Sequence, residues 1–158
     1  MSFKKTLTLT AAAAAIGFSG AALADGHGDD HAYDADQALF IVTSDSLETQ
    51  GMAMILANAM HEQGTTPHFL LCDGAGDLAV ESYSSDGINT PPGHPMEQIT
   101  PEGLLQMMMG EGASVEVCAI YLPNSEHGEE DLREGVSVAA PGPMAEMMRD
   151  PAIPVFSF

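Results

Sequence analysis

The feature that most constrains this sequence is an apolar run followed at once by a helical pattern and a second apolar run. Residues 38–43 (ALFIVT) are apolar almost throughout and end in β-branched side chains. Such a run is typical of a strand that is buried on both faces, as in a parallel sheet. Residues 47–63 carry apolar side chains at helical spacing, and residues 68–72 (HFLLC) form the second run. This order predicts a parallel strand–helix–strand unit with a right-handed crossover.

The rest of the chain continues the alternation of strands and helices. Thr100 and Pro101 provide an N-cap and a first-turn proline for a helix that runs to about residue 110. Residues 82–98 are rich in Ser, Asn, Gly and Pro and predict a long surface loop. Further expected elements are short helices at 77–81 and 129–133, strands at 114–121 and 153–158, and a helix at 143–149. The pattern predicts an α/β fold, a three-layer open, mostly parallel sheet of four or five strands with helices on both faces.

The amino-terminal segment has the order of a secretory signal peptide. Lys4 and Lys5 precede an apolar stretch, and small residues end in Ala22-Leu23-Ala24. This is the pattern of a signal peptide with an A-x-A cleavage site, so we expect residues 1–24 to be removed after Ala24. The mature protein is then periplasmic or secreted. No later stretch approaches the ~18 consecutive apolar residues of a membrane span, so no membrane insertion is expected after cleavage.

The mature chain is expected to consist of an arm and one domain. Residues 25–36 (DGHGDDHAYDAD) are polar and acidic and predict a flexible amino-terminal arm. Residues 37–158 have the length of a single domain.

The charge of the chain excludes two classes of partner. The sequence has 23 acidic and 4 basic side chains, giving a formal net charge of −19. Nucleic acids and anionic membranes are disfavoured, because phosphate binding needs Lys and Arg. The acidic residues either attract a cationic partner or maintain solubility in a salty exterior, where ions screen their repulsion. Their scattered distribution favours solubility.

Several catalytic and cofactor motifs are missing. The first strand–helix turn, residues 43–46 (TSDS), contains neither G-x-G-x-x-G nor G-K-[ST], which disfavours dinucleotide and P-loop nucleotide binding. The sequence has no G-x-S-x-G elbow of a serine hydrolase and no C-x-x-C pair of a thioredoxin-type protein. No cofactor is therefore required by the sequence.

Three stretches of the chain resemble the DsrE family, the small α/β proteins that include subunits of sulfur-relay complexes. They are ALFIVTSDSLETQGMAMILANAM, FLLCDGAGDLAV, and GASVEVCAIYLPN with the later EEDLREGVSVA, and the resemblance covers residues 37–158. It implies a parallel-sheet α/β fold and a homo-oligomer. In the sulfur-carrying members one Cys of the late strand region holds a persulfide, and the matching position here is Cys118. The sequence departs from the relay subunits after Cys118, where Ala-Ile-Tyr-Leu-Pro-Asn replaces their small-residue and Arg-containing turn, and in its export signal.

The two cysteines are the first candidates for chemistry. Cys118 is either a thiolate that accepts sulfane sulfur, which requires a lowered pKa, or an inert buried residue of a strand. Cys72 ends the second expected strand, at the sheet edge where open α/β proteins bind ligands, and is either a second redox thiol or part of the core. We expect the two not to form a disulfide. If their strands are not neighbours, the cysteines lie at least ~9.6 Å apart, beyond the ~7 Å that a disulfide spans.

The expected mature terminus, Asp25-Gly26-His27, is a candidate metal site. A free α-amine, two deprotonated amides and an imidazole in third place can wrap a square-planar ion, a geometry that favours Cu(II) or Ni(II). The alternative is that His27 stands in a polar spacer by chance.

The methionine and remaining histidine residues give weaker signals. The 11 Met are interpreted as core and oligomer-interface filling in a chain that is poor in aromatic residues, rather than as Cu(I) ligands. His61, His68, His94 and His127 lack zinc-site spacing. His94, in the Pro-rich loop, is the best candidate among them for a mobile site residue.

The leading hypothesis is an exported DsrE-like carrier of sulfane sulfur, or a thiol-redox binder, that acts through Cys118 with a protein sulfur donor or acceptor. The first alternative is a Cu(II)- or Ni(II)-binding protein. The second is a non-catalytic oligomeric interaction protein in which both cysteines are buried.

Overall fold

The computed structural model describes residues 35–94 and 96–158. The expected signal peptide, residues 1–24, and the candidate chelate Asp25, Gly26 and His27 lie outside the described residues and stay predictions. No helix of the described part is long and apolar enough to cross a membrane.

The domain is built on a five-stranded sheet in which every pair of neighbours is parallel. Its strands are β1 (Gln37–Val42), β2 (Thr66–Leu71), β5 (Ser114–Val117), β6 (Val136–Val138) and β7 (Val155–Ser157), and the spatial order is β6-β5-β2-β1-β7. The predicted parallel sheet is therefore confirmed. The expected strand–helix–strand unit is also confirmed, because β1 and β2 pair in parallel on either side of helix α1 (Leu47–His61).

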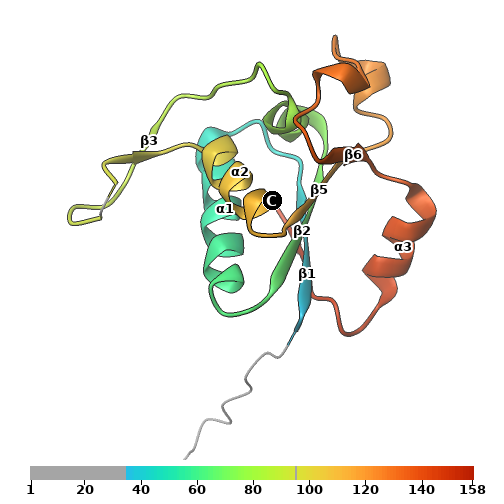
Figure 1. Ribbon diagram of the computed structural model, residues 1–158, viewed down its shortest axis with the longest axis horizontal. Coiled ribbons are helices and arrows are strands. Elements are labelled where there is room, and N and C mark those ends of the chain that lie inside the picture. The colour runs from blue at the N-terminus through green and yellow to red at the C-terminus, as the bar shows by residue number, and fades with distance from the viewer. Residues whose placement is uncertain (1–34, 95) are drawn as a thin grey trace, which may run out of the picture. The chain divides into compact units, whose positions relative to one another are not determined.

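Helices cover both faces of the sheet. Helices α1 and α2 (Pro101–Gly110) lie on one face, and α3 (Pro141–Arg149) lies on the other (Figure 1). This is the three-layer arrangement that the alternation of elements predicted.

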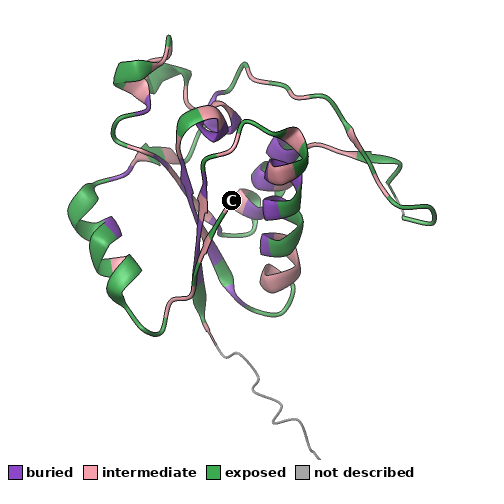
Figure 2. Ribbon diagram, turned by 180° about the vertical axis from the view of Figure 1, so that it is seen from behind, coloured by how far each residue is buried: buried purple, intermediate pink, exposed green. Residues whose placement is uncertain are grey.

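The two faces of the sheet differ in the extent of the apolar core that they bury. On the α1 and α2 face Phe40 and Phe69 are fully buried, with ring centroids 5.5 Å apart, among many other buried side chains. On the α3 face the buried cluster contains only Leu39, Leu70, Ala139 and Met144. Figure 2 shows the same contrast, since α3 is exposed along most of its surface.

Helix α1 is confirmed, but its buried side differs from the residues that the sequence places at helical spacing, which are Met52, Ile55, Leu56, Ala59 and Met60. Met52, Ile55 and Leu56 are 50%, 41% and 45% exposed. The buried side consists of Gln50, Gly51, Ala53, Met54 and Ala57. These residues are mostly small, which lets the helix pack closely against its neighbours; a side chain at Gly51 would overlap Ile88. The stripe formed by Met52, Ile55 and Leu56 is therefore left uncovered in the single chain.

The connections contain short elements that the sequence pattern did not resolve. The expected loop 82–98 includes an antiparallel pair of two-residue strands, β3 (Ile88–Asn89) and β4 (Gln98–Ile99). The short helix expected at 77–81 is a 3₁₀ segment that begins and ends earlier, η1 (Asp73–Ala79), and the one expected at 129–133 is a shorter 3₁₀ segment, η3 (Glu129–Asp131). A third 3₁₀ segment, η2 (Leu122–Asn124), follows β5. The expected strand 114–121 ends early, at Val117, because the chain turns at Cys118.

Candidate functional site

The two cysteines are joined at the carboxyl edge of the sheet. Strands β2 and β5 are direct neighbours, and their last residues, Leu71 and Val117, are register partners. Cys72 and Cys118 follow them and form a disulfide, with the two Cα atoms 5.1 Å apart. The expectation that no disulfide forms was wrong, because it assumed that the two strands are not adjacent. The chain instead returns from α2 directly to the free edge of β2.

Backbone hydrogen bonds hold both cysteines in place. The Cys118 amide donates to the Leu71 carbonyl over 2.8 Å, and the Cys72 amide donates to the Val42 carbonyl over 2.9 Å. The chain then turns sharply after each of them. The Ala75 amide donates to the Cys72 carbonyl, and the Tyr121 amide donates to the Cys118 carbonyl. The sulfurs thus belong to the rim of the sheet, where both residues are partly exposed.

An open depression lies beside the disulfide, with a volume of about 770 Å³. Cys72 and Cys118 line it together with the start of η1 and the segment that follows β5. Its ionisable lining residues are Asp73, Asp77, Tyr121, Glu126 and His127. In the described part of the chain no Lys or Arg lines it, so the depression is acidic.

Tyr121 closes the inner side of the depression. Its ring packs against Gly76, where a side chain would overlap it, and its hydroxyl donates to Asp77 Oδ1 over 2.6 Å. Burial raises the pKa of the Tyr121 phenol, and the hydrogen bond to Asp77 raises that pKa further. The phenol therefore stays protonated and neutral at physiological pH.

Cys118 also lines a second, apolar pocket of about 210 Å³ on the α3 face. Its other lining residues are apolar: Leu70, Ala119, Ile120, Ala139, Pro141 and Met144. Ile120, between the pocket and the acidic depression, is 74% exposed. Cys72 lines the acidic depression and also packs against the buried cluster on the α3 face, but it does not line the apolar pocket. The two sulfur positions are therefore not equivalent.

A polar cluster lies nearer the amino ends of the same two strands. His68 Nε2 is 2.9 Å from Glu116 Oε2, and the Ser114 hydroxyl contacts His68 Nδ1. This cluster was not predicted from the sequence, because His68 lies 46 residues from Ser114 and 48 from Glu116 and meets them only through the pairing of β2 with β5.

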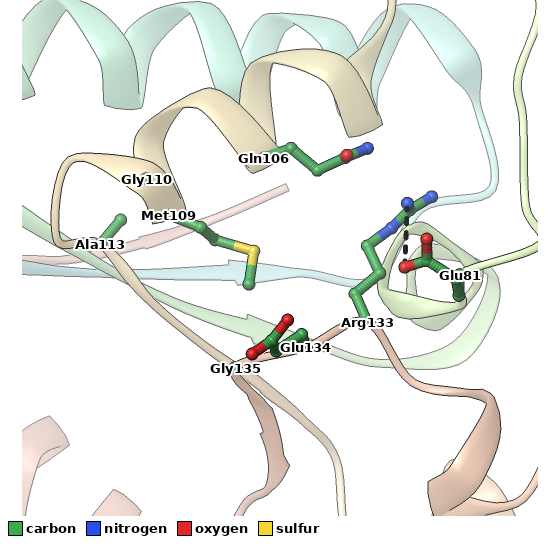
Figure 3. A pocket seen from close by; sticks show the side chains of 8 residues that line it. All are labelled: Glu81, Gln106, Met109, Gly110, Ala113, Arg133, Glu134 and Gly135. Carbon is green, nitrogen blue, oxygen red and sulfur yellow. Dashed lines mark ion pairs between the residues drawn. The ribbon is translucent and has the colours of Figure 1, made fainter.

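A further cavity of about 390 Å³ surrounds Arg133 (Figure 3). Arg133 is buried, and its Nε and Nη2 donate to the carbonyls of Leu78 and Tyr83, each over 2.9 Å. Its Nη1 lies 3.8 Å from Glu81 Oε2. Arg133 therefore ties the η1 segment to the chain before β6, and it is not among the residues around the disulfide.

Of the histidines His94 and His127, one lies in the 82–98 segment and the other lies at the depression. His127 lines the depression, which the sequence analysis did not foresee. His94, the expected site residue, is exposed in the 82–98 segment, where its Nδ1 lies 3.0 Å from the Met96 carbonyl oxygen. Across residues 35–94 and 96–158, no three His, Cys, Asp or Glu side chains are grouped so as to hold a metal ion.

The order of the sheet and the helices on its two faces define a DsrE/YchN-like fold. Two solved structures are similar to this chain over 77% of its length. The ychN protein of E. coli has 18% sequence identity, a TM-score of 0.54 and 99% of its own chain covered. Protein MTH1491 of Methanobacterium thermoautotrophicum, described as a protein of unknown function, has 16% identity, a TM-score of 0.56 and 98% covered. These likenesses establish the fold. No protein-family model matches the chain, and no curated protein sequence matches it.

Proposed function

We propose that this protein is a thiol–disulfide redox protein in which Cys72 and Cys118 cycle between a disulfide and a dithiol. The observation that carries the proposal is the Cys72–Cys118 disulfide at the carboxyl edge of the sheet, beside an open depression. Ligands of open α/β sheets bind at this edge. A disulfide that served only to staple the core would not need an adjoining depression.

In the reduced state Cys118 carries sulfane sulfur. The Cys118 thiolate attacks the outer sulfur of a donor persulfide, which forms a Cys118 persulfide and releases the donor thiolate. The Cys72 thiolate then attacks the Cys118 sulfur, which forms the Cys72–Cys118 disulfide and releases hydrosulfide. The sulfane sulfur is reduced to sulfide, and the two cysteine sulfurs supply the electron pair. A thiol reductant restores the dithiol.

The surroundings of the two cysteines support this division of roles. Cys118 borders both the acidic depression and the apolar pocket, so a sulfur atom added to Cys118 has space on two sides. Cys72 borders the depression but not the apolar pocket, and it lies within disulfide distance of Cys118. In this proposal Cys72 is the resolving thiol, and the resemblance to sulfur-carrying DsrE proteins supports Cys118 as the persulfide carrier.

The proposal includes export and association. Cleavage after Ala24 delivers the chain to the periplasm or exterior, where disulfides form and persist. A protein sulfur donor or acceptor meets the disulfide edge. The uncovered stripe of Met52, Ile55 and Leu56 on α1 joins copies of the chain into a homo-oligomer, as exposed apolar patches often do.

Intact-mass spectrometry of the reduced protein after treatment with a sulfane-sulfur donor tests the function. The Cys72→Ser variant is expected to retain a gain of about 32 Da, one sulfur atom, because it lacks the resolving thiol. The wild type is expected to lose that gain, form the disulfide and release hydrosulfide, which is measured separately.

The Cys118→Ser variant is the matched control and is expected to gain no sulfur. If Cys118→Ser gains sulfur as readily as Cys72→Ser, the assigned roles are wrong. If neither variant gains sulfur and the wild type releases no hydrosulfide, the sulfur-carrier function is wrong.

A further inference from the structure

The charge around the disulfide limits which thiols can reach it. Asp73 and Glu126 are exposed at the depression, and Asp77 is half-buried and accepts a hydrogen bond from the Tyr121 hydroxyl. Tyr121 adds no positive charge, because it is a neutral hydrogen-bond donor. Among the described residues, His127 is the one basic side chain that lines the depression, and its Nδ1 is 4.0 Å from Asp131 Oδ2, a further carboxylate. An approaching thiolate therefore faces mainly carboxylates.

The described chain provides no strong cation to offset these carboxylates. The four basic residues of the sequence are Lys4, Lys5, Arg133 and Arg149, and only the two arginines belong to the described residues. Arg133 is buried against the carbonyls of Leu78 and Tyr83, and Arg149 ends helix α3. Neither arginine lines the depression.

The size of the depression suits a small molecule. Its volume of about 770 Å³ lies within the roughly 300–1,000 Å³ that is usual for small-molecule sites. A cleft lined by one sign of charge focuses its field and changes association rates by a factor of roughly 10 to 1,000. The field acts over about 8 Å at physiological ionic strength, a range comparable with such a cleft.

We infer that the depression selects its redox partner by charge, and that the partner is a thiol with a positive charge close to its sulfur, an aminothiol or its persulfide. This inference rests on the proposed function and names the substrate class of the same site. The ammonium group lies among the carboxylates of Asp73, Asp77 and Glu126 while the sulfur meets the disulfide. Thiols that carry carboxylates, such as glutathione, are repelled.

The reaction is thiol–disulfide exchange. The aminothiol thiolate attacks one sulfur of the Cys72–Cys118 bond, forms a mixed disulfide, and displaces the other cysteine as a thiolate, which takes up a proton. A second aminothiol attacks the mixed disulfide. The products are the protein dithiol and the oxidised aminothiol disulfide, so two thiols are oxidised for each protein disulfide reduced.

The test compares three small thiols whose reacting thiolate forms differ in net charge. Cysteamine is net neutral, 2-mercaptoethanol singly negative and 3-mercaptopropionate doubly negative. Reduction rates of the native protein are divided by the thiolate concentration and by the rate on an uncharged model disulfide. Cysteamine is expected to be fastest, with roughly tenfold between successive members at low ionic strength and a much smaller spread in high salt.

A pair of matched variants locates the effect. Asp73→Asn with Glu126→Gln removes two carboxylates from the depression and is expected to reduce the spread of rates several-fold. Asn is suited to position 73, where φ is 50°. Glu48→Gln with Glu97→Gln removes the same charge from exposed positions outside the depression and is expected to leave the spread unchanged.

The outcomes separate the inference from the function on which it rests. Equal normalised rates, a reversed order, or an undiminished spread in the Asp73→Asn, Glu126→Gln variant would overturn charge selection while leaving the redox function intact. Failure of all three thiols and of dithiothreitol to reduce the native protein would overturn the redox function itself.

A second arm distinguishes a small aminothiol from a basic segment of a protein. The peptides Lys-Cys-Lys and Glu-Cys-Glu are compared with cysteamine under the same normalisation. A faster Lys-Cys-Lys than Glu-Cys-Glu supports charge selection. If the normalised rate of cysteamine is higher than that of Lys-Cys-Lys, the partner is a small aminothiol. If the rate of Lys-Cys-Lys is higher, the partner is a basic segment of a protein.

Discussion

The two faces of the sheet differ in how much apolar core they bury. On the α1 and α2 face, Phe40, Phe69 and Met54 are fully buried in the main core. On the α3 face, one short helix covers a cluster of four buried residues, and the disulfide and the apolar pocket lie beside it. The comparison indicates that the first face contains most of the buried core, whereas the disulfide lies at the rim beside the smaller cluster of the second.

The largest expected effect is a difference between two matched methionine truncations. Met54→Ala, on α1, is expected to lower the free energy of unfolding by about 2–5 kcal/mol, the usual range for a buried methionine. Met144→Ala, on α3, should cost roughly half of that or less, because its pocket already contains unfilled space. Urea denaturation of oxidised protein measures both, and equal losses would contradict the contrast between the faces.

The next effect concerns the disulfide as a link across the sheet. Cys72 and Cys118 are separated by 46 residues, so reduction should lower the free energy of unfolding by about 2–4 kcal/mol, chiefly through greater freedom of the unfolded chain. Urea curves with and without dithiothreitol measure this loss. The Cys72→Ser, Cys118→Ser double variant serves as the control and should show no response to dithiothreitol; an unchanged wild type would contradict the cross-link.

A smaller effect is expected where the depression meets the main core. Tyr121→Phe removes the hydrogen bond to Asp77 and should cost about 1–2 kcal/mol at neutral pH. Burial raises the pKa of Tyr121 above the ordinary value of 10.0. The folded state therefore favours the protonated phenol. The resulting contribution to the free energy of unfolding is fully present below pH 10 and is lost as the pH rises through the folded-state pKa.

Ultraviolet absorbance titration measures this phenol as the difference between wild type and Tyr121→Phe. The transition that is absent from Tyr121→Phe should have a higher pKa than the transition of a free tyrosine. A difference transition at the ordinary tyrosine pKa would show that the hydroxyl is neither buried nor bonded to Asp77.

The smallest effect on stability is expected at the exposed stripe of α1. Ile55→Ser should change the free energy of unfolding of the separate chain by about 0.5 kcal/mol or less, the usual limit for surface substitutions. Because we propose that the stripe joins copies of the chain, the same variant should have a lower sedimentation mass than the wild type. Asn58→Ser on the same helix is the control, and identical masses for wild type and Ile55→Ser would contradict the proposed interface.

The sequence predicts the layers of the fold well and the site only in part. Apolar runs and helical spacing are local properties, and they identify β1, α1 and β2 correctly. The neighbour of β2 is a tertiary choice, which is why the disulfide between Cys72 and Cys118 was missed. The helical spacing of α1 identifies the helix but not its buried side, because small residues such as Gly51 make the close contact and leave Met52 exposed.

The acidic depression was also beyond what local sequence patterns can predict. Asp73 and Glu126 are far apart in the chain, and their charges look scattered until the turns after β2 and β5 bring them to one rim. Solubility seemed the better explanation of the acidic composition. The depression gives part of that charge a local position beside the disulfide, from which the proposed selection of cationic thiols follows.

The reduction potential of the native disulfide tests the central claim most directly. The protein is equilibrated in dithiothreitol redox buffers without denaturant and is then alkylated. Intact-mass spectrometry gives, for each buffer, the fraction of molecules in which both Cys72 and Cys118 are modified. A redox-active pair should have a potential between about −270 and −120 mV, the range of known exchange proteins. A potential below about −300 mV, typical of structural disulfides, would contradict the account.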